Sequence, residues 1–127
     1  MRVTGDRRGR TARRGEALAA LLLRLKGYRI EARNWRCPLG EIDIVARSGD
    51  TLVFVEVKTR GGTSAGSPVE AVDERKRRQL VRLAHAYLGR FRGELPPCRF
   101  DVIAVEGRGI RSRLRHLCDA FRADGLV

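Results

Sequence analysis

Two acidic residues and a lysine near the middle of the chain have the types and spacing that metal-assisted hydrolysis requires. Asp43 lies in residues 41–47, where acidic and aliphatic residues alternate, and Glu56 and Lys58 lie in the valine-rich residues 52–59. Both patterns are typical of β-strands. Because side chains alternate between the two faces of a strand, Glu56 and Lys58 share one face.

The relative positions of the two carboxylates depend on how the two strands are joined. Turn-forming residues between them predict a β-hairpin. A loop of two or four residues places Asp43 opposite Glu56, whereas a loop of three residues places it opposite Val55. On the first strand we expect Ile42 and Ile44 to share the face opposite to that of Asp43.

Two interpretations of this charged group remain open. In the first register the Cβ atoms of Asp43 and Glu56 would lie roughly 5 Å apart, and a divalent cation between them would remove their repulsion. Lys58 could then position or help deprotonate an attacking water molecule. Alternatively, these three residues and Glu41 form cross-strand salt bridges on a solvated face, and spacing alone gives both interpretations equal weight. The apolar residues 52–55 cover both faces of their strand, which weighs against the solvated face.

The elements that must position these residues follow from hydrophobic periodicity and turn signals. The first three strands should form an antiparallel meander, and a long helix should join the third strand to a parallel fourth strand. The prediction is an α/β fold in the order α-β-β-β-α-β, with a mixed β-sheet flanked by helices and a further short helix at the end. The expected ranges are a helix over 14–26, strands over 28–36, 41–47, 52–59 and 99–105, a Gly- and Ser-rich loop over 61–67, and helices over 68–89 and 113–121.

The charge of the chain favours a polyanionic partner. Among 127 residues, 27 are lysine or arginine and 15 are acidic, which gives a formal charge of +12. Most of the excess is arginine, whose planar fork matches phosphate oxygens, so nucleic acid is the expected partner. We interpret residues 1–13 as a basic, disordered arm and residues 14–127 as a single domain.

Composition also bounds the cellular setting. No apolar run approaches the roughly 20 residues of a membrane-spanning helix, and the basic start lacks the apolar region of a secretory signal. We therefore expect a cytoplasmic protein with no membrane partner. The three widely spaced cysteines fit neither a disulfide framework nor a paired zinc site, and we interpret them as free thiols.

Several short motifs resemble those of the YraN family of bacterial proteins. The similarity extends over about residues 13–121, and the YraN family is in turn similar to the PD-(D/E)XK nucleases and, in particular, to archaeal Holliday junction resolvases. The motifs are Gly15-Glu16, GEID at residues 40–43, FVEVKTR at residues 54–60 and RFDV at residues 99–102.

The resemblance implies a restriction-endonuclease-like fold and a role for each site residue. It implies that Asp43 and Glu56 bind Mg²⁺ or Mn²⁺, that Lys58 assists the attacking water and that Glu16 supports the metal or its water shell. Without the resemblance, Glu16 reads more simply as an acidic residue in the first turn of a helix. The proline expected before the first aspartate is replaced by Ile42, which removes no ligand.

Basic residues near these acids are candidates for phosphate contacts. We expect nucleic-acid binding by Arg60 and by the charged start of the long helix, namely Arg75, Lys76, Arg77 and Arg78. Gln79 could line the same cleft, although a solvent-facing or capping role is favoured. Trp35 could stack on a base, although a core or edge position is favoured.

Three functions fit these features. The first is a metal-dependent endonuclease that hydrolyses DNA phosphodiester bonds, with branched or junction structures as substrates and DNA favoured over RNA. The two-fold symmetry of a four-way junction hints at a homodimer. The second is a non-catalytic nucleic-acid-binding protein on a nuclease scaffold, and the third is adhesion to ribosomes through the basic surface alone.

Overall fold

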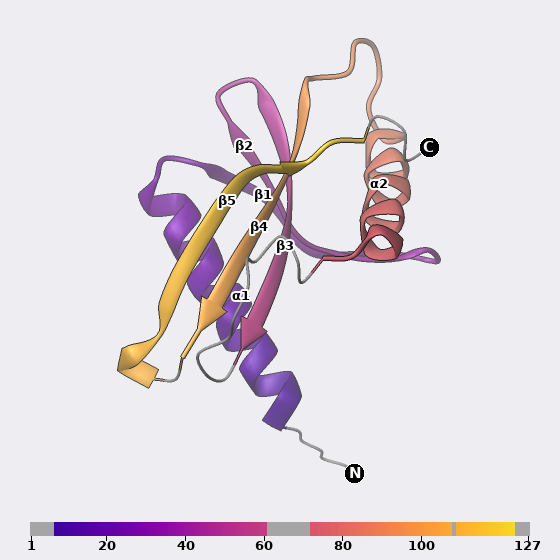
Figure 1. Cartoon of the computed structure of the whole chain (residues 1–127). Helices are drawn as coiled ribbons and strands as arrows, with labels where there is room; N and C mark the ends of the chain where they lie inside the picture. The colour runs from indigo at the N-terminus through magenta and orange to yellow at the C-terminus, as the bar shows by residue number, and fades with distance from the viewer. Residues whose placement is uncertain (1–6, 61–71, 108, 124–127) are drawn as a thin grey trace.

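The computed structural model describes residues 7–60, 72–107 and 109–123. One five-stranded sheet in the order β1-β2-β3-β4-β5 forms the centre of the molecule, with a helix on each face (Figure 1). This arrangement confirms the predicted mixed α/β sheet. The elements are α1 (Arg7–Leu25), β1 (Arg29–Cys37), β2 (Gly40–Ser48), β3 (Thr51–Arg60), α2 (Glu74–Leu88), β4 (Cys98–Glu106), a 3₁₀ turn (Gly109–Arg111) and β5 (Arg113–Phe121).

The pairing of the strands follows the predicted topology. Strands β1, β2 and β3 are antiparallel neighbours, and β3 pairs in parallel with β4. A two-residue loop, Gly49-Asp50, joins β2 to β3, and Ile44 pairs with Val55. The register is therefore the one in which Asp43 approaches Glu56, and the three-residue loop is excluded.

The last element was predicted wrongly as a helix. Residues 113–121 form β5, which pairs antiparallel with β4 along the free edge of that strand. Leu114, Leu117 and Phe121 have the spacing of one helical face, which explains the error. A register shift near Phe100 and a positive φ of 54° at Asp119 break the alternation of β5, so the strand lacks the period that would have identified it.

Both helices begin at residues that differ from those predicted from the sequence. Helix α1 begins at Arg7, so residues 7–13 of the predicted arm are helical, because arginine and alanine are good helix formers. Helix α2 begins at Glu74, after Asp73, whose Oδ1 accepts a hydrogen bond from the Lys76 N–H at 2.9 Å. The predicted start at Pro68 and the loop over 61–67 lie outside the described residues, but Val72 and Asp73 are not helical.

Two hydrophobic clusters fill the opposite faces of the sheet. Helix α1 packs on one face through Ala19, Ala20 and Leu23, and helix α2 packs on the other through residues that include Leu80 and Leu83. Within the described residues, no helix is both long enough and apolar enough to cross a membrane.

Helix α1 approaches the end of β3 very closely at Gly15. A Cβ atom at this position would clash with Oγ1 of Thr59, far inside the van der Waals distance. Gly15 therefore sets how near α1, with Glu16 at the next position, can lie to the charged end of β3.

We expect Gly15→Ala to destabilise the fold by about 1–3 kcal/mol, since the new methyl group forces α1 away from β3. Urea unfolding should show a lower midpoint for this variant. Thr59→Ala in the same chain should restore much of the loss because it removes the clashing oxygen. No rescue by Thr59→Ala would contradict the close approach.

Candidate active site

The site is built around a point where β2 separates from β3. The ladder between these strands stops at the pair of Ile44 with Val55, and Asp43 is the next residue of β2. Instead of a ladder bond, the Val57 N–H donates a hydrogen bond to Oδ2 of Asp43 at 2.8 Å. The carboxylate thus satisfies a backbone donor that the departing strand no longer reaches.

The separation is accompanied by a bend in both strands of the first hairpin. Asn34 on β1 has a positive φ of 52°, a conformation that asparagine tolerates better than most residues. Ile42 packs in the cluster on the α2 side, whereas Ile44 packs in the cluster on the α1 side. The expectation that Ile42 and Ile44 share a face was therefore wrong, because the strand bends at Asp43. The β1–β2 hairpin then runs toward the start of α2 (Figure 1).

Glu56 lies beneath two lysines on the α2 side of the sheet. Its side chain is buried, with the residue 6% exposed. Its Oε2 lies 3.9 Å from Nζ of Lys58 and 3.8 Å from Nζ of Lys76, which is on the first turn of α2. Lys58 was predicted here from the strand alternation. Lys76 was predicted only as a phosphate contact, because its pairing with Glu56 depends on how α2 packs.

Glu16 approaches the group from α1. Its Oε1 accepts a hydrogen bond from Nδ2 of Asn34 at 2.9 Å. Its negative charge also raises the pKa of both Asp43 and Glu56. The structure therefore brings all four predicted residues, Glu16, Asp43, Glu56 and Lys58, to one place, and adds Asn34, which no sequence signal singled out.

The two carboxyl groups ionise less readily than usual. Burial raises the pKa of Asp43 to about 7, with a further increase from the charge of Glu56, while the Val57 N–H opposes both. Burial also raises the pKa of Glu56, although Lys76 and Lys58 oppose this. Without a further cation, two ionised carboxylates at this position are unfavourable.

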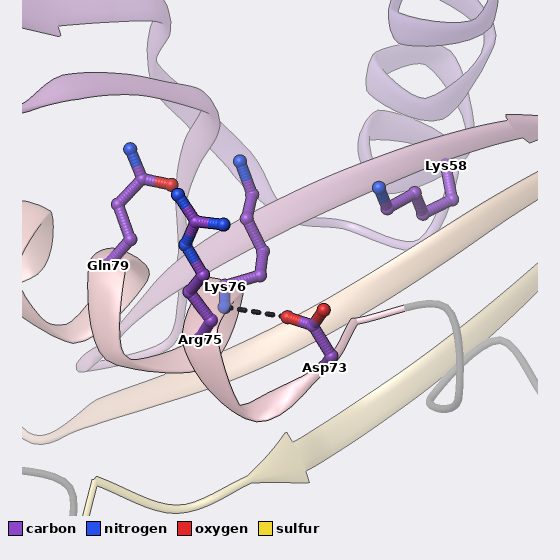
Figure 2. Close-up of a pocket in the computed structure, with 5 residues that line it drawn as sticks. All are labelled: Lys58, Asp73, Arg75, Lys76 and Gln79. Atoms are coloured by element: carbon purple, nitrogen blue, oxygen red, sulfur yellow. Dashed lines mark hydrogen bonds between the residues drawn. The ribbon is translucent and has the colours of Figure 1, made fainter.

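A polar hollow of about 320 Å³ opens beside Glu56, at the two lysines that pair with this residue. Its lining side chains are Lys58 from β3 and Asp73, Arg75, Lys76 and Gln79 from the start of α2 (Figure 2). Gln79 also donates a hydrogen bond through Nε2 to the Leu39 carbonyl oxygen at 3.2 Å, which links α2 to the β1–β2 turn. Gln79 thus both lines the hollow and caps the turn.

The remaining basic candidates differ in their surroundings. Arg75 and Lys76 face the hollow. Arg78 pairs with Glu74 at 3.4 Å, and Arg60 pairs with Glu106 at 3.7 Å. Nε of Arg77 donates to the Val72 carbonyl oxygen and its guanidinium lies 5.5 Å from the ring centroid of Phe121, so part of its role is structural. Phosphate contact by these residues remains a prediction.

Comparison with known proteins gives the family. The family model of the uncharacterised protein family UPF0102 matches residues 15–105. The chain belongs to this family. It is 53% identical over 115 residues to a UPF0102 protein of Symbiobacterium thermophilum, with 90% of this chain and 98% of the relative covered. It is 55% identical over 105 residues to one of Moorella thermoacetica, with 83% and 85% covered.

The matched UPF0102 region contains all four site residues from Glu16 to Lys58 and extends to Val105 in β4. The predicted resemblance to the YraN family is confirmed, since UPF0102 is that family. The family itself is uncharacterised, so the chemistry of a UPF0102 protein has to be argued from its side chains.

A second polar cluster of this UPF0102 chain lies on the α1 side, around Asp101, which is 1% exposed. Asp101 accepts hydrogen bonds from Nε and Nη2 of Arg99, both at 2.9 Å, and from the Asp119 N–H at 2.9 Å. Nε2 of His116 lies 2.8 Å from its Oδ2, and Cys118 lies close enough to complete a potential metal-ligand set.

The positive groups around this cluster argue against a metal there. Arg99 occupies both oxygens of Asp101, and Nζ of Lys26 lies 2.6 Å from Nδ1 of His116. Burial raises the pKa of Asp101, but hydrogen bonds from His116, Arg99 and Asp119 outweigh it, so the pKa is lowered. We interpret the cluster as an anchor between β4 and β5.

We expect removal of the Asp43 charge to stabilise the metal-free protein. The folded pKa of Asp43, about 7, lies above the ordinary value of 3.8, so ionisation costs folded-state stability as pH rises through this range. The free energy of unfolding of Asp43→Asn, measured with urea at pH 8 in EDTA, should therefore be about 1–2 kcal/mol higher than that of the wild type. The gain should vanish at pH 4. Asp50→Asn, in the β2–β3 loop, is the control and should show no such gain.

Asp101→Asn should have the opposite effect. Because the folded pKa of Asp101 is lowered, its ionised form contributes stability at neutral pH that is lost as the pH falls through that pKa. We expect a loss of about 2–3 kcal/mol at pH 7, since Arg99 would lose a buried charged partner. Chemical unfolding at pH 7 and pH 3 should show a smaller difference from wild type at the lower pH. A difference that is equal at both values would argue against a charged role.

Proposed function

We propose that this protein is a metal-dependent endonuclease that hydrolyses phosphodiester bonds in DNA. The observation that carries the proposal is the convergence of the Asp43 and Glu56 carboxylates where β2 leaves β3, with Lys58 beside them. A basic hollow adjoins this group. An acid with a raised pKa beside a second acid is typical of functional sites, which supports this proposal.

The donor set fits a hard divalent cation. Asp43 and Glu56 offer carboxylate oxygens, which Mg²⁺ and Mn²⁺ prefer, and neither a cysteine nor a histidine is among the groups described around them. The Val57 N–H donates to Oδ2 of Asp43 and so holds this carboxylate in place. Such an ion would supply Lewis acidity toward a phosphate oxygen and toward an attacking water.

The side chains of the protein would divide the remaining work. Lys58, whose Nζ lies 3.9 Å from Glu56, is placed to hold and polarise a water molecule at the carboxylate. Lys76 and Arg75, which line the hollow, would hold phosphate oxygens by charge and hydrogen bonding. Glu16, fixed by Asn34, would add a negative charge that strengthens cation binding.

The charge of the whole chain supports a nucleic-acid substrate. A net charge of +12 favours a nucleic-acid duplex or strand over a small phosphate ester. We propose DNA in preference to RNA and branched DNA as the preferred form. A homodimer would match the two-fold symmetry of a junction.

The direct test is cleavage of labelled DNA. Purified protein should cut single-stranded, flap or four-way-junction substrates when Mg²⁺ or Mn²⁺ is added, and EDTA should abolish the cutting. Asp43→Asn, Glu56→Gln and Lys58→Ala should each lower the rate by at least a hundredfold, since each removes a group that acts on the reacting atoms.

A matched control distinguishes the loss of a site carboxylate from a general change in the charge of the protein. Asp50→Asn removes one carboxylate from the exposed β2–β3 loop and should cut as the wild type does. Titration calorimetry with Mn²⁺ should show binding to the wild type and none to Asp43→Asn. Equal cleavage by the wild type, Asp43→Asn and Glu56→Gln would defeat the assignment.

The alternative is a non-catalytic nucleic-acid-binding protein on the same scaffold. The pairing of Glu56 with both Lys58 and Lys76 favours it, because these ammonium groups partly compensate the acid without a metal ion. This alternative predicts salt-sensitive DNA binding that survives the three substitutions, with no cleavage by the wild type in any metal.

A further inference from the structure

A second hollow, of about 390 Å³, lies between β1 and the C-terminal end of α2. It shares no lining residue with the hollow beside Glu56. This volume is in the range of small-molecule sites. The lining side chains are Glu31, Ala32, Trp35, Tyr87, Arg90 and Phe91.

Three aromatic rings and the guanidinium group of Arg90 line this hollow. Trp35 packs edge-to-face on Tyr87, with the ring centroids 5.3 Å apart, and Tyr87 lies 6.0 Å from Phe91. The guanidinium of Arg90 lies 4.9 Å from the centroid of Tyr87, and that of Arg47 lies 5.7 Å from the centroid of Phe91. Aromatic faces with adjacent arginines are the groups on which unpaired bases stack.

A fixed acceptor lies at the edge of the same hollow. The Tyr87 hydroxyl donates to Oε1 of Glu31, and Nε of Arg47 donates to its Oε2 at 2.9 Å. Burial raises the pKa of Glu31, but these two hydrogen bonds outweigh burial and the pKa is lowered overall. The group is therefore a carboxylate at neutral pH. A carboxylate accepts hydrogen bonds from an N–H group of a base, such as the ring N–H of thymine or uracil, and repels a phosphate, so the base rather than the phosphate fits here.

A row of arginines lies along α2 and reaches the hollow beside Glu56. Arg75, Arg78 and Arg82 follow one another along one side of α2 and line a third hollow of about 310 Å³, together with Gln79 and the half-exposed Leu39. Arg75 and Gln79 also line the hollow beside Glu56. From Lys76 to Tyr87 the helix rises about 16 Å, which a strand of a few nucleotides can span.

We propose that the hollow around Trp35 captures an unpaired base of a single nucleic-acid strand whose phosphates follow the arginines of α2 toward the acidic site. Duplex DNA does not fit this hollow, because its bases are stacked and paired. An aromatic peptide would use the rings but would have no use for three arginines in a row. The inference deepens the proposed function by naming the substrate as a strand with an unpaired segment, but base capture does not require hydrolysis.

The test uses Trp35, the only tryptophan of the chain, as the reporter. In EDTA, where no metal-dependent cleavage occurs, a short oligothymidylate should quench the tryptophan fluorescence with saturation. A hairpin duplex of equal charge should bind without this quenching. Oligouridylate in a parallel titration separates RNA from DNA as the source of the strand.

Two further variants test the inference without changing Trp35, which also packs against Tyr87. Phe91→Ala and Arg90→Ala should weaken binding of labelled oligothymidylate, measured by anisotropy, by about tenfold each, since each removes a stacking contact. Arg92→Ala, an exposed arginine of the same loop outside the hollow, is the control and should weaken it no more than twofold. Thermal melting should confirm that all three variants are folded.

Two outcomes would overturn the inference. One is binding of the oligonucleotide without any change in Trp35 fluorescence, and the other is equal weakening by Arg90→Ala and Arg92→Ala. Asp43→Asn should retain the quenching, because that substitution removes only the proposed hydrolytic site. A protein that cuts DNA but shows no quenching would retain the nuclease proposal and lose this one.

Discussion

The hydrogen bond from the Val57 N–H to the Asp43 carboxylate is the contact on which the rest of the site depends. A sheet normally keeps its strands paired because an unpaired backbone donor is costly once buried. Here the Asp43 side chain replaces the missing carbonyl, so β2 can leave β3 at Ile44 without leaving the Val57 N–H unpaired. The separation brings the Asp43 carboxylate to the backbone of β3, close to Glu56, and directs the first hairpin toward α2.

The packing of both helices is adjusted to this separation. On one face, Gly15 lets α1 come close enough to Thr59 for Glu16 to reach Asn34 at the bend. On the other face, α2 places Lys76 over Glu56 and Gln79 against the β1–β2 turn. Buried acids of like charge oppose folding, and the surrounding cores of the two faces compensate for that cost. Such an arrangement is typical of a site kept for chemistry or binding.

The sequence predicted the part of the fold that depends on short-range pattern. The alternation of residues 41–47 and 52–59 correctly gave the hairpin and the shared face of Glu56 and Lys58, whereas its register depended on the loop length, which the structure decided. Residues 113–121 were mistaken for a helix, because Leu114, Leu117 and Phe121 mimic helical spacing and the bulge at Asp119 hides the strand period. The start of α2 was also misplaced, since a proline was favoured over the Asp73 cap.

What the sequence determined by itself was the set of acidic and basic groups, their alternation along two strands and the charge that favours a polyanion. The tertiary structure decided the bend at Asn34 and Asp43, the pairing of Lys76 with Glu56 and the aromatic hollow around Trp35. These features join residues that are far apart along the chain, and they depend on how helices pack against a sheet. Local propensity carries no information about such distances, because packing is set by all the side chains at an interface together.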